Sequence, residues 1–486
     1  MGANHAWVAP GQLIGDWLSA QAHLPQYLQA RARVAGAARR VVPLGDLCSR
    51  ITQGPNPKYT SNDYPCVITR NVANDQLQMS GSNWVSADEF SRLQRFKLQR
   101  GDILVTLKGA GSTGKACVFD TDVEAIHSRE VGVVRVSDST LNPRFLCVYF
   151  QGRFGRLLFD QGTTGSTGQL TLSTTYLKSL PVPLPDRRIQ DYIGAKVLLA
   201  ERCRSRSAKL RSRAMELLAQ SWAWGNRGPA ELQDKAASQI AHTVEPRIFE
   251  DRLDPEFYRP SFLAVDGWLD GQPCWSLSEL VEAPVKGVQP SYDPDGSVPA
   301  LTVTHVDPFV LDRNGASGLV TDAWLSRNAR ARIEAGELLY TVTGPPLGET
   351  VVVEEFHLPA AVNSHVARVA LRPHFNFPHL VTGMLNSPLG QLQTTRYSKG
   401  IRQKELYPVD FARFRFPKLS SQTCTRLEKD FAASCRLVEE ARVLTEQAKA
   451  DVEALIEGTL DVQAILSGTV KAPTTDDIPE LAEDDA

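Results

Sequence analysis

The first place in this sequence where chemistry is conceivable is a glycine-rich segment that ends in a lysine. Residues 109–116 read GAGSTGKA, which nearly matches the phosphate-binding pattern GxxxxGK[S/T]. In that pattern the last residue binds Mg²⁺ and a helix follows directly, whereas this chain has Ala116 and then the strand-like residues 117–119. The sequence therefore favours a glycine hairpin between two strands. A nucleotide-binding enzyme that uses the Gly109–Lys115 loop is the alternative.

Motifs for other kinds of catalysis are missing. The one Pro-Pro pair, Pro345-Pro346, precedes Leu347, so the Asn/Asp-Pro-Pro-aromatic motif of methyltransferases is absent. No lysine has an acidic residue two positions before it, as the acidic-x-Lys end of a restriction-type nuclease core would require. Eight cysteines without a Cys-x-x-Cys pair and nine dispersed histidines predict no metal site. We expect neither a cofactor nor catalysis by this chain.

The sequence repeats itself at long range. Residues 101–109 read GDILVTLKG, and residues 336–344 read GELLYTVTG, about 235 positions further along. Residues 125–128 (AIHS) have a counterpart in residues 361–364 (AVNS) at nearly the same offset. Such a repeat is far longer than the 20–50 residues of a solenoid unit. The pattern predicts two copies of one globular domain.

Two segments have helical rather than strand-like periodicity. Apolar residues recur at steps of three and four from Ile189 to Leu217, skipping only Ser207, and again from Leu427 to Leu455. These narrow seams predict two long helices, which we expect to pair as an antiparallel coiled coil. Between residues 187 and 222 there are nine Lys and Arg against three Asp and Glu.

Proline- and glycine-rich connections separate these helices from strand-rich regions, and the predicted fold class is α+β. The expected segments are a strand-rich domain with an N-terminal helical segment (1–185), a long helix (186–222), a linker (223–246), a second strand-rich domain (247–417), a second long helix (418–458) and an acidic, disordered tail (459–486).

The composition predicts a chain that remains in the cytoplasm. It is 42% hydrophobic and 22% charged, with a formal net charge of −2. No apolar run approaches the ~18 residues of a membrane span, and residues 1–5 (MGANH) do not begin a secretory signal. We expect no contact with a membrane. Because the overall charge is near zero, an affinity for nucleic acid must come from local clusters.

Basic and hydrogen-bonding residues gather in the loops of both copies. Arg and Lys suit phosphates and guanine edges, whereas Asn and Gln suit adenine edges. We interpret these residues as candidate DNA contacts. In the first copy they are Lys58, Tyr59, Arg70, Asn71, Lys108, Ser112, Thr113, His127, Arg129, Thr163, Thr164, Thr167 and Gln169, and in the second they are Tyr292, His305, Thr343, Asn363, His365, Arg396, Tyr397, Ser398, Lys399, Arg402, Gln403 and Lys404.

The order of these features resembles the specificity subunits of type I restriction–modification systems. Each copy opens alike, with residues 42–47 (VPLGDL) and 275–280 (WSLSEL), and continues to the repeated glycine-acidic motif. Residues 181–185 (PVPLP) close the first copy before its helix, and residues 251–258 (DRLDPEFY) look like the family's entry segment to the second. The second copy departs from the pattern at its close, where residues 414–417 read FRFP.

The resemblance implies a non-catalytic subunit with two target-recognition domains, joined by two antiparallel helices. Each domain would read half of a split double-stranded DNA site, and methyltransferase subunits would dock on the scaffold, with or without restriction and translocase subunits. A helix over residues 187–222 would span roughly 54 Å, longer than one DNA turn of ~34–36 Å. A protein scaffold without DNA contacts is the other alternative.

Overall fold

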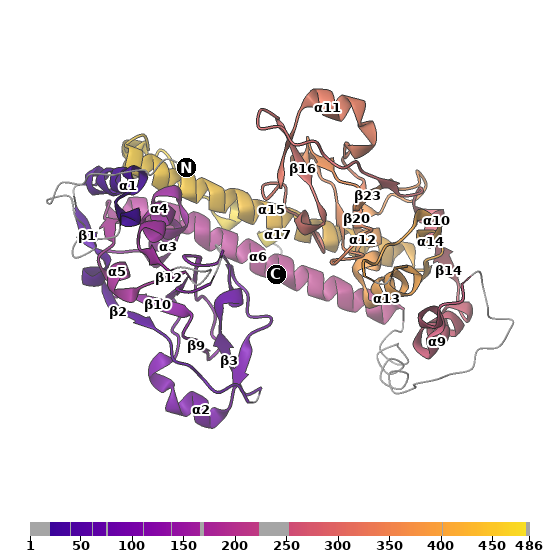
Figure 1. Cartoon of the computed structure of the whole chain (residues 1–486), viewed down its shortest axis with the longest axis horizontal. Coiled ribbons are helices and arrows are strands. Elements are labelled where there is room, and N and C mark those ends of the chain that lie inside the picture. Colours follow the sequence, from indigo (N-terminus) through magenta and orange to yellow (C-terminus); the bar gives the residue numbers. More distant parts are fainter. Residues whose placement is uncertain are drawn as a thin grey trace. The chain divides into compact units, whose positions relative to one another are not determined.

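The computed structural model describes residues 20–222 and 252–482, apart from residues 39, 61, 74–75, 110, 138, 166–169 and 401. The chain divides into two compact units (Figure 1). Unit 1 comprises Met1–Arg204 and Glu439–Ala486, and unit 2 comprises Ser205–Val438. The predicted linker 223–246 and the beginning of the predicted N-terminal helical segment lie outside the described residues.

Unit 1 is built on short strands rich in buried β-branched residues. Its main sheet is antiparallel, and its central strand β7 is buried along its whole length. The main sheet has the order β2 (Cys48–Gln53), β10 (Val131–Val136), β7 (Ile103–Thr106), β8 (Ala116–Val118), a second sheet has the order β6 (Asn83–Val85), β3 (Tyr64–Val67), β9 (Ile126–His127), and three strand pairs are β4 (Val72–Ala73) with β5 (Gln76–Leu77), β1 (Val41–Pro43) with β13 (Pro181–Pro183), and β11 (Thr163–Thr164) with β12 (Thr171–Leu172).

Unit 2 repeats the strand order of both sheets and two of the three strand pairs, as expected for two strand-rich domains of one kind. The pair β11–β12 is replaced by isolated bridges that Glu405 makes with Thr343 and Lys399. The main sheet has the order β15 (Val285–Lys286), β23 (Val366–Val369), β20 (Leu338–Thr341), β21 (Thr350–Val352), the second sheet has the order β19 (Gly318–Val320), β16 (Val298–Leu301), β22 (Ala361–Val362), and the strand pairs are β17 (Val306–Asp307) with β18 (Val310–Leu311) and β14 (Cys274–Ser276) with β24 (Arg415–Pro417).

The repeated glycine-acidic motif has the same structural role in both units. Asp102, directly before β7, forms a two-pronged ion pair with Arg135 on the neighbouring strand β10, with both N–O distances 2.7 Å. Glu337 forms the equivalent pair with Arg368, at 2.9 and 2.6 Å. Each acidic side chain also accepts a backbone N–H from the residue three positions before it. The motif therefore fixes a turn and joins two strands.

Short helices cover the sheets of each unit. The end of α3 meets the edge strand β8 through Gln151, whose Nε2 donates to Ala116 O at 2.9 Å. Asn386 at the end of α12 does the same to Thr350 O on β21, at 2.8 Å. The helices of unit 1 are α1 (Pro25–Gly36), α2 (Ala87–Arg92), α3 (Pro143–Gln151), α4 (Arg153–Gln161) and α5 (Thr174–Lys178), and those of unit 2 are α9 (Pro260–Asp270), α10 (Leu277–Leu280), α11 (Asp322–Arg327), α12 (Pro378–Asn386), α13 (Pro388–Tyr397) and α14 (Pro408–Phe411).

The two predicted long helices are present as α6 (Arg187–Ser221) and α15 (Ser421–Glu457). In unit 1 the beginning of α6 lies antiparallel to the end of α15. Lys196 Nζ contacts Asp451 Oδ2 at 2.5 Å, and Arg204 Nη2 donates to Thr445 Oγ1 at 2.8 Å. Apolar residues of both helices, such as Ile193 and Val452, join the core of the unit.

In unit 2 the end of α6 lies antiparallel to the beginning of α15. Ser207, which interrupts the predicted apolar seam, is nevertheless buried, because it pairs with Ser434. Ser207 Oγ donates to Ser434 O at 2.8 Å, and Ser434 Oγ donates back to Ser207 O at 3.2 Å. Further along, Trp222 Nε1 donates to Pro417 O at 3.0 Å. The seam therefore continues through a reciprocal polar contact that the periodicity did not predict.

The acidic tail differs from the prediction of disorder over its described residues, 459–482. It forms α16 (Val462–Ser467) and α17 (Pro479–Ala482). The apolar side chains Ile465, Ile478 and Leu481 are buried, and Ile465 belongs to the core of unit 1. The acidic composition of this segment predicted disorder, but its few apolar side chains pack into unit 1 and hold the segment against it.

Candidate nucleic-acid interface

The Gly109–Lys115 segment is a turn between antiparallel strands. It connects β7 to β8, which pair directly. The end of the turn hydrogen-bonds to Thr106 on β7: Gly114 N donates to the carbonyl oxygen of Thr106 at 2.8 Å, and Lys115 N donates to its Oγ1 at 2.9 Å. A strand follows the lysine, whereas a phosphate-binding loop leads into a helix whose N-terminus faces the phosphate. The geometry therefore fits the predicted hairpin and not the nucleotide-binding alternative.

Asn71 and His305, two predicted DNA contacts, are buried at equivalent positions and cap equivalent turns. Asn71 Oδ1 accepts the N–H of Ile68 at 2.8 Å, and His305 Nδ1 accepts that of Thr302 at 2.9 Å. Their other ends donate to the following hairpins, to Gln78 O and Gly315 O, both at 2.7 Å. In this structure they hold loops in place and present no polar edge to a ligand.

His127 and Asn363 are likewise equivalent and buried, on β9 and just after β22. His127 Nδ1 donates to Val131 O at 2.8 Å, and burial lowers the pKa of this imidazole to about 4. The ring is therefore neutral at pH 7. Asn363 Oδ1 accepts the N–H of the half-buried His365 at 3.1 Å. His127 and Asn363 therefore support the fold here and are not exposed to DNA.

The predicted cationic stretch near residue 400 is largely compensated within unit 2. Arg396 is buried, pairs with Asp266 and lies over the ring of Phe257. Lys399 Nζ contacts Asp410 at 2.8 Å, and Lys404 Nζ contacts Glu256 at 3.1 Å. The neighbouring Thr343, Tyr397 and Ser398 are also buried, whereas Arg402 and Gln403 are exposed.

The structure brings together several predicted residues around the β7–β8 turn of unit 1. Lys108 and Thr171 form a backbone bridge, which joins this turn to the β11–β12 pair. Thr113 Oγ1 donates to Gly109 O at 2.8 Å, and Thr163 Oγ1 donates to Phe159 O at 2.7 Å. Ser112 is half-buried and Thr164 is exposed. Thr167 and Gln169 lie outside the described residues.

A second group of predicted residues meets at the second sheet of unit 1. Arg70 Nη2 donates to Asn83 Oδ1 at 3.0 Å, and the hydroxyl of Tyr59 lies against Asn83 and Cys66. Tyr59 is 44% exposed, and Arg70 is exposed beside it. Burial of its inner edge is the main cause that raises the pKa of Tyr59 to about 12, so the phenol stays protonated. Lys58 and Arg129 are exposed too. In unit 2, the predicted Tyr292 is 47% exposed.

Two arginines that the sequence reasoning missed flank one aromatic ring. The guanidinium carbons of Arg50 and Arg95 lie 6.0 and 4.7 Å from the centre of the Phe96 ring. Arg50 also faces Arg135 across the β2–β10 pair, and desolvation together with the positive charge of Arg135 lowers its pKa. Among the described residues no carboxylate pairs with Arg50 or Arg95. The Arg95-Phe96 dipeptide was the available signal, but an arginine beside an aromatic residue is common.

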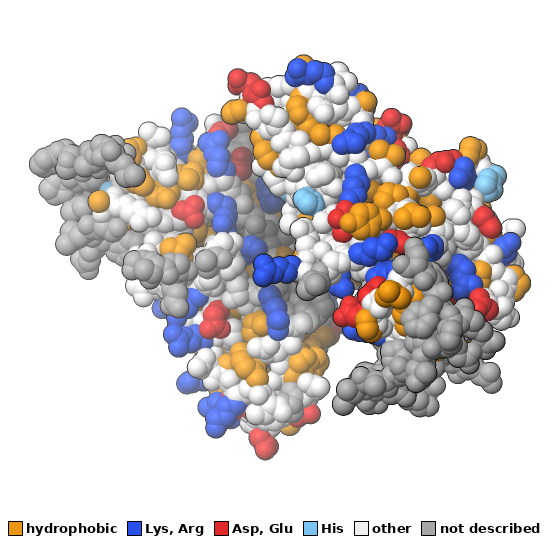
Figure 2. All heavy atoms as spheres, turned by 45° about the vertical axis from the view of Figure 1, so that its right-hand side comes forward, with side chains coloured by type: hydrophobic (Ala, Val, Ile, Leu, Met, Phe, Trp, Pro, Cys, Tyr) orange, Lys and Arg blue, Asp and Glu red, His pale blue; other side chains and the backbone are white. Residues whose placement is uncertain are grey.

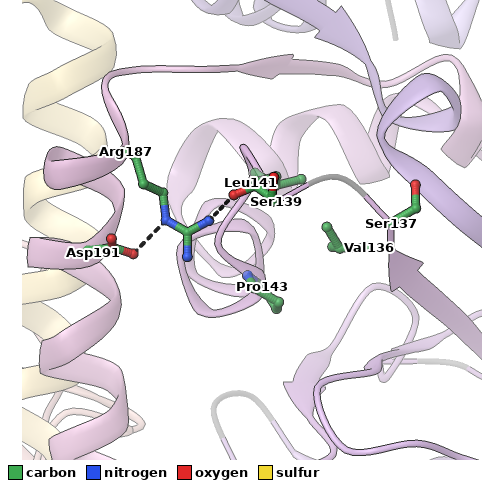
Figure 3. A pocket seen from close by; sticks show the side chains of 7 residues that line it. All are labelled: Val136, Ser137, Ser139, Leu141, Pro143, Arg187 and Asp191. Carbon is green, nitrogen blue, oxygen red and sulfur yellow. Dashed lines mark hydrogen bonds and ion pairs between the residues drawn. The ribbon is translucent and has the colours of Figure 1, made fainter.

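A hollow of about 640 Å³ lies between the end of β10 and the beginning of α6 (Figure 3). Arg187 reaches across it to Ser139 O, and its Nε contacts Asp191 Oδ1 at 2.8 Å. Among the described residues that line it, Asp191 has the only carboxylate, and this is paired. The carboxylate of Asp191 is therefore held by Arg187 at the wall of the hollow.

The described part of the chain contains no cluster of His, Cys, Asp and Glu that could hold a metal ion. It also contains no helix that is apolar over a length sufficient to span a membrane. On the face drawn in Figure 2, blue Lys and Arg side chains occur on the surface of both units. Arg50 and Arg95 are one local group of positive charge in unit 1.

Comparison with known proteins supports this view of unit 1. Residues 40–197 match the family model described as type I restriction modification DNA specificity domain. Unit 1 is therefore similar to that domain over these residues. The match covers the sheets, the arginine pair and the group around Tyr59, and it ends within α6. No curated protein matches the chain.

Solved structures with similarity to the chain include two specificity subunits. The type I restriction–modification system S subunit from M. genitalium shares 13% identity, with 87% of this chain and 96% of that chain covered and a TM-score of 0.41. The HsdS subunit from Thermoanaerobacter tengcongensis shares 15% identity, with 87% and 97% covered and a TM-score of 0.28.

Proposed function

We propose that the whole chain is the DNA-specificity subunit of a type I restriction–modification system and reads a bipartite duplex target. The observation that carries this proposal is the match of residues 40–197 to the DNA specificity domain model, together with the same strand order in the two sheets of unit 2. Because unit 2 has the same topology, its natural role is to read the second half-site. The long helices then connect the two readers and set the spacing between half-sites.

The exposed Arg95 and the half-buried Arg50 provide the electrostatic part of binding in the first domain. Arg50 and Arg95 are held by the ring of Phe96 and have no carboxylate partner among the described residues, so their charges are available to DNA phosphates. Lys58 and Arg129 add two charges that are exposed. In unit 2, Arg402 is the exposed member of the predicted cationic stretch, and Gln403 beside it can hydrogen-bond to DNA.

Catalysis belongs to partners in this proposal. Methyltransferase subunits would bind the scaffold and modify the DNA that the two domains select, and restriction or translocase subunits would join them in a cleaving complex. The chain would act in the cytoplasm, where its DNA is. Its own contribution is recognition and geometry, with no cofactor.

The test is a salt titration of the full chain on duplex DNA. Each neutralised phosphate contributes about 0.9 to the slope of log affinity against log salt, so Arg50→Ala with Arg95→Ala should lower the slope by roughly 2. The matched control is Arg153→Ala with Arg188→Ala, which removes two exposed arginines of unit 1 that already pair with Glu457 and Asp186. This control should leave the slope nearly unchanged. Wild-type protein without salt-dependent DNA binding would refute the proposal in favour of a protein scaffold.

A further inference from the structure

The two units share an exposed tyrosine on a loop of the same pattern. Residues 54–59 read GPNPKY and residues 287–292 read GVQPSY, so both loops follow Gly-x-x-Pro-x-Tyr. The two tyrosines, Tyr59 and Tyr292, are 44% and 47% exposed. A large aromatic side chain exposed to the same degree at equivalent positions of two diverged domains points to contact with something outside the chain.

The glycine at the start of each loop fixes where the tyrosine stands. A Cβ on Gly54 would lie 2.3 Å from Ser128 O, and one on Gly287 would lie 2.2 Å from Val362 O. Both glycines are therefore pressed against the backbone at the end of the parallel strand, β9 or β22. No other residue allows the loop to leave the sheet so close to its neighbour.

Each tyrosine lies beside the first residue of the outer strand in the second sheet. Tyr59 contacts Asn83, which opens β6, and the ring of Tyr292 covers Gly318, which opens β19. The next residue of each strand is also exposed and apolar, Trp84 at 39% and Leu319 at 37%. The shared framework is thus a tyrosine beside the opening of a strand.

The framework presents different polar groups in the two units. In unit 1, Arg70 Nη2 donates to Asn83 Oδ1 at 3.0 Å. Arg70 also lies beside Gly81, since its Nε would be 3.7 Å from a Cβ on that glycine, and the missing side chain leaves room for the guanidinium to lie flat against Gly81. Among the described residues no carboxylate pairs with Arg70. The residues at the same places in unit 2, immediately before His305 and at the opening of β19, are Thr304 and Gly318.

We propose that these equivalent surfaces choose the bases of the two half-sites, and that Arg70 reads a guanine in the half-site of unit 1. One Nη of the guanidinium is held by Asn83, while its remaining N–H groups can donate to O6 and N7 of guanine in the major groove. Tyr59 and Tyr292 supply the contact common to both halves. Thr304 and Gly318 cannot make this bidentate contact, so unit 2 chooses its bases differently. The inference rests on the proposed function.

The experiment selects bound duplexes from a pool with a randomised stretch, using the full chain and its variants at fixed salt. Arg70→Lys keeps the charge but loses the planar fork. It should reduce the preference at one G·C pair of one half-site by about 10- to 100-fold and leave the salt slope unchanged. The matched control, Arg153→Lys, exchanges an exposed arginine on α4 and should alter no preference. Thermal unfolding of each variant shows whether it is folded.

A second variant imports the residues of unit 2, Arg70→Thr with Asn83→Gly, and should relax the same position without affecting the other half-site. If the wild-type protein selects a bipartite sequence and Arg70→Lys selects the same one, the inference is wrong although the proposed function stands. If Arg70→Ala instead lowers affinity equally for all sequences and reduces the salt slope by about one, Arg70 contacts a phosphate and the base assignment is overturned. If the wild-type protein selects no sequence at all, the proposed function fails.

Discussion

Replacing Gly54 or Gly287 by alanine should damage one unit and spare the other. The new Cβ of Gly54→Ala would lie 2.3 Å from Ser128 O and 2.5 Å from His127 O, and that of Gly287→Ala would meet Val362 O and Asn363 O at 2.2 and 2.5 Å. These obstacles are backbone atoms at the end of a paired strand or directly after it, so no side chain can rotate away. Overpacking costs 1–3 kcal/mol in ordinary cores, and we expect about 3 kcal/mol at each of these sites.

The assay is hydrogen exchange followed peptide by peptide. Gly54→Ala should speed the exchange of β3 and β9 and leave β16 and β22 protected as before, whereas Gly287→Ala should do the reverse. Gly36→Ala is the control, because nothing lies within 4 Å of its Cβ at the end of α1. Each damaging variant should also lose preference in only one DNA half-site, since the loop carries Tyr59 or Tyr292. If Gly54→Ala is as stable as Gly36→Ala, the close approach does not constrain the fold as argued.

Two further predictions follow from the buried ionisable groups. Burial is the chief cause that lowers the pKa of His127 in the folded protein to about 4. Its contribution to stability is therefore complete above pH ~6.5 and is lost as the pH falls toward 4, at up to about 3 kcal/mol. In His127→Asn, which imports the residue of unit 2, the stability of unit 1 should depend less steeply on pH over that range, and an unchanged acid-unfolding profile would contradict the assignment. Arg396→Ala should lower the free energy of unfolding of unit 2 by about 3 kcal/mol, the low end for a broken buried pair because Arg415 still contacts Asp266. Replacing the exposed Arg402 by alanine should leave denaturant unfolding unchanged and reduce only the salt slope of DNA binding by about one. Equal effects of the two variants on stability would refute the distinction.

The architecture could be predicted from the sequence because it depends on repeated and periodic features. The glycine-acidic motif at residues 101 and 336 marked equivalent turns, and the structure shows why: Asp102 and Glu337 each cap the turn and bind an arginine on the next strand. The long helices were predictable from their apolar steps. Ser207 broke that pattern, since a polar residue is read as exposed unless its partner, Ser434, is known.

The candidate site was harder to predict because a polar loop residue looks the same whether it binds DNA or its own backbone. Asn71 and His305 have the residue types of base contacts, but both cap turns, a role that depends on backbone geometry that the sequence does not reveal. Arg396 and Lys399 were chosen for charge, and their acidic partners lie far away in the sequence or on another turn. Arg50 was missed because it stands alone within a strand.

The two units differ least where polar residues support the fold and most where they meet solvent. The buried caps at residues 71 and 305, the ion pairs of Asp102 and Glu337 and the amide contacts to the edge strands occur in both copies. The positions beside the shared tyrosine differ, with the exposed Arg70 and the half-buried Asn83 in one unit and the exposed Thr304 and the half-buried Gly318 in the other. An exposed substitution there would disturb neither core, because the supporting contacts lie beneath it. Such a division allows the bases that a domain reads to change while its fold and its attachment to the long helices stay the same.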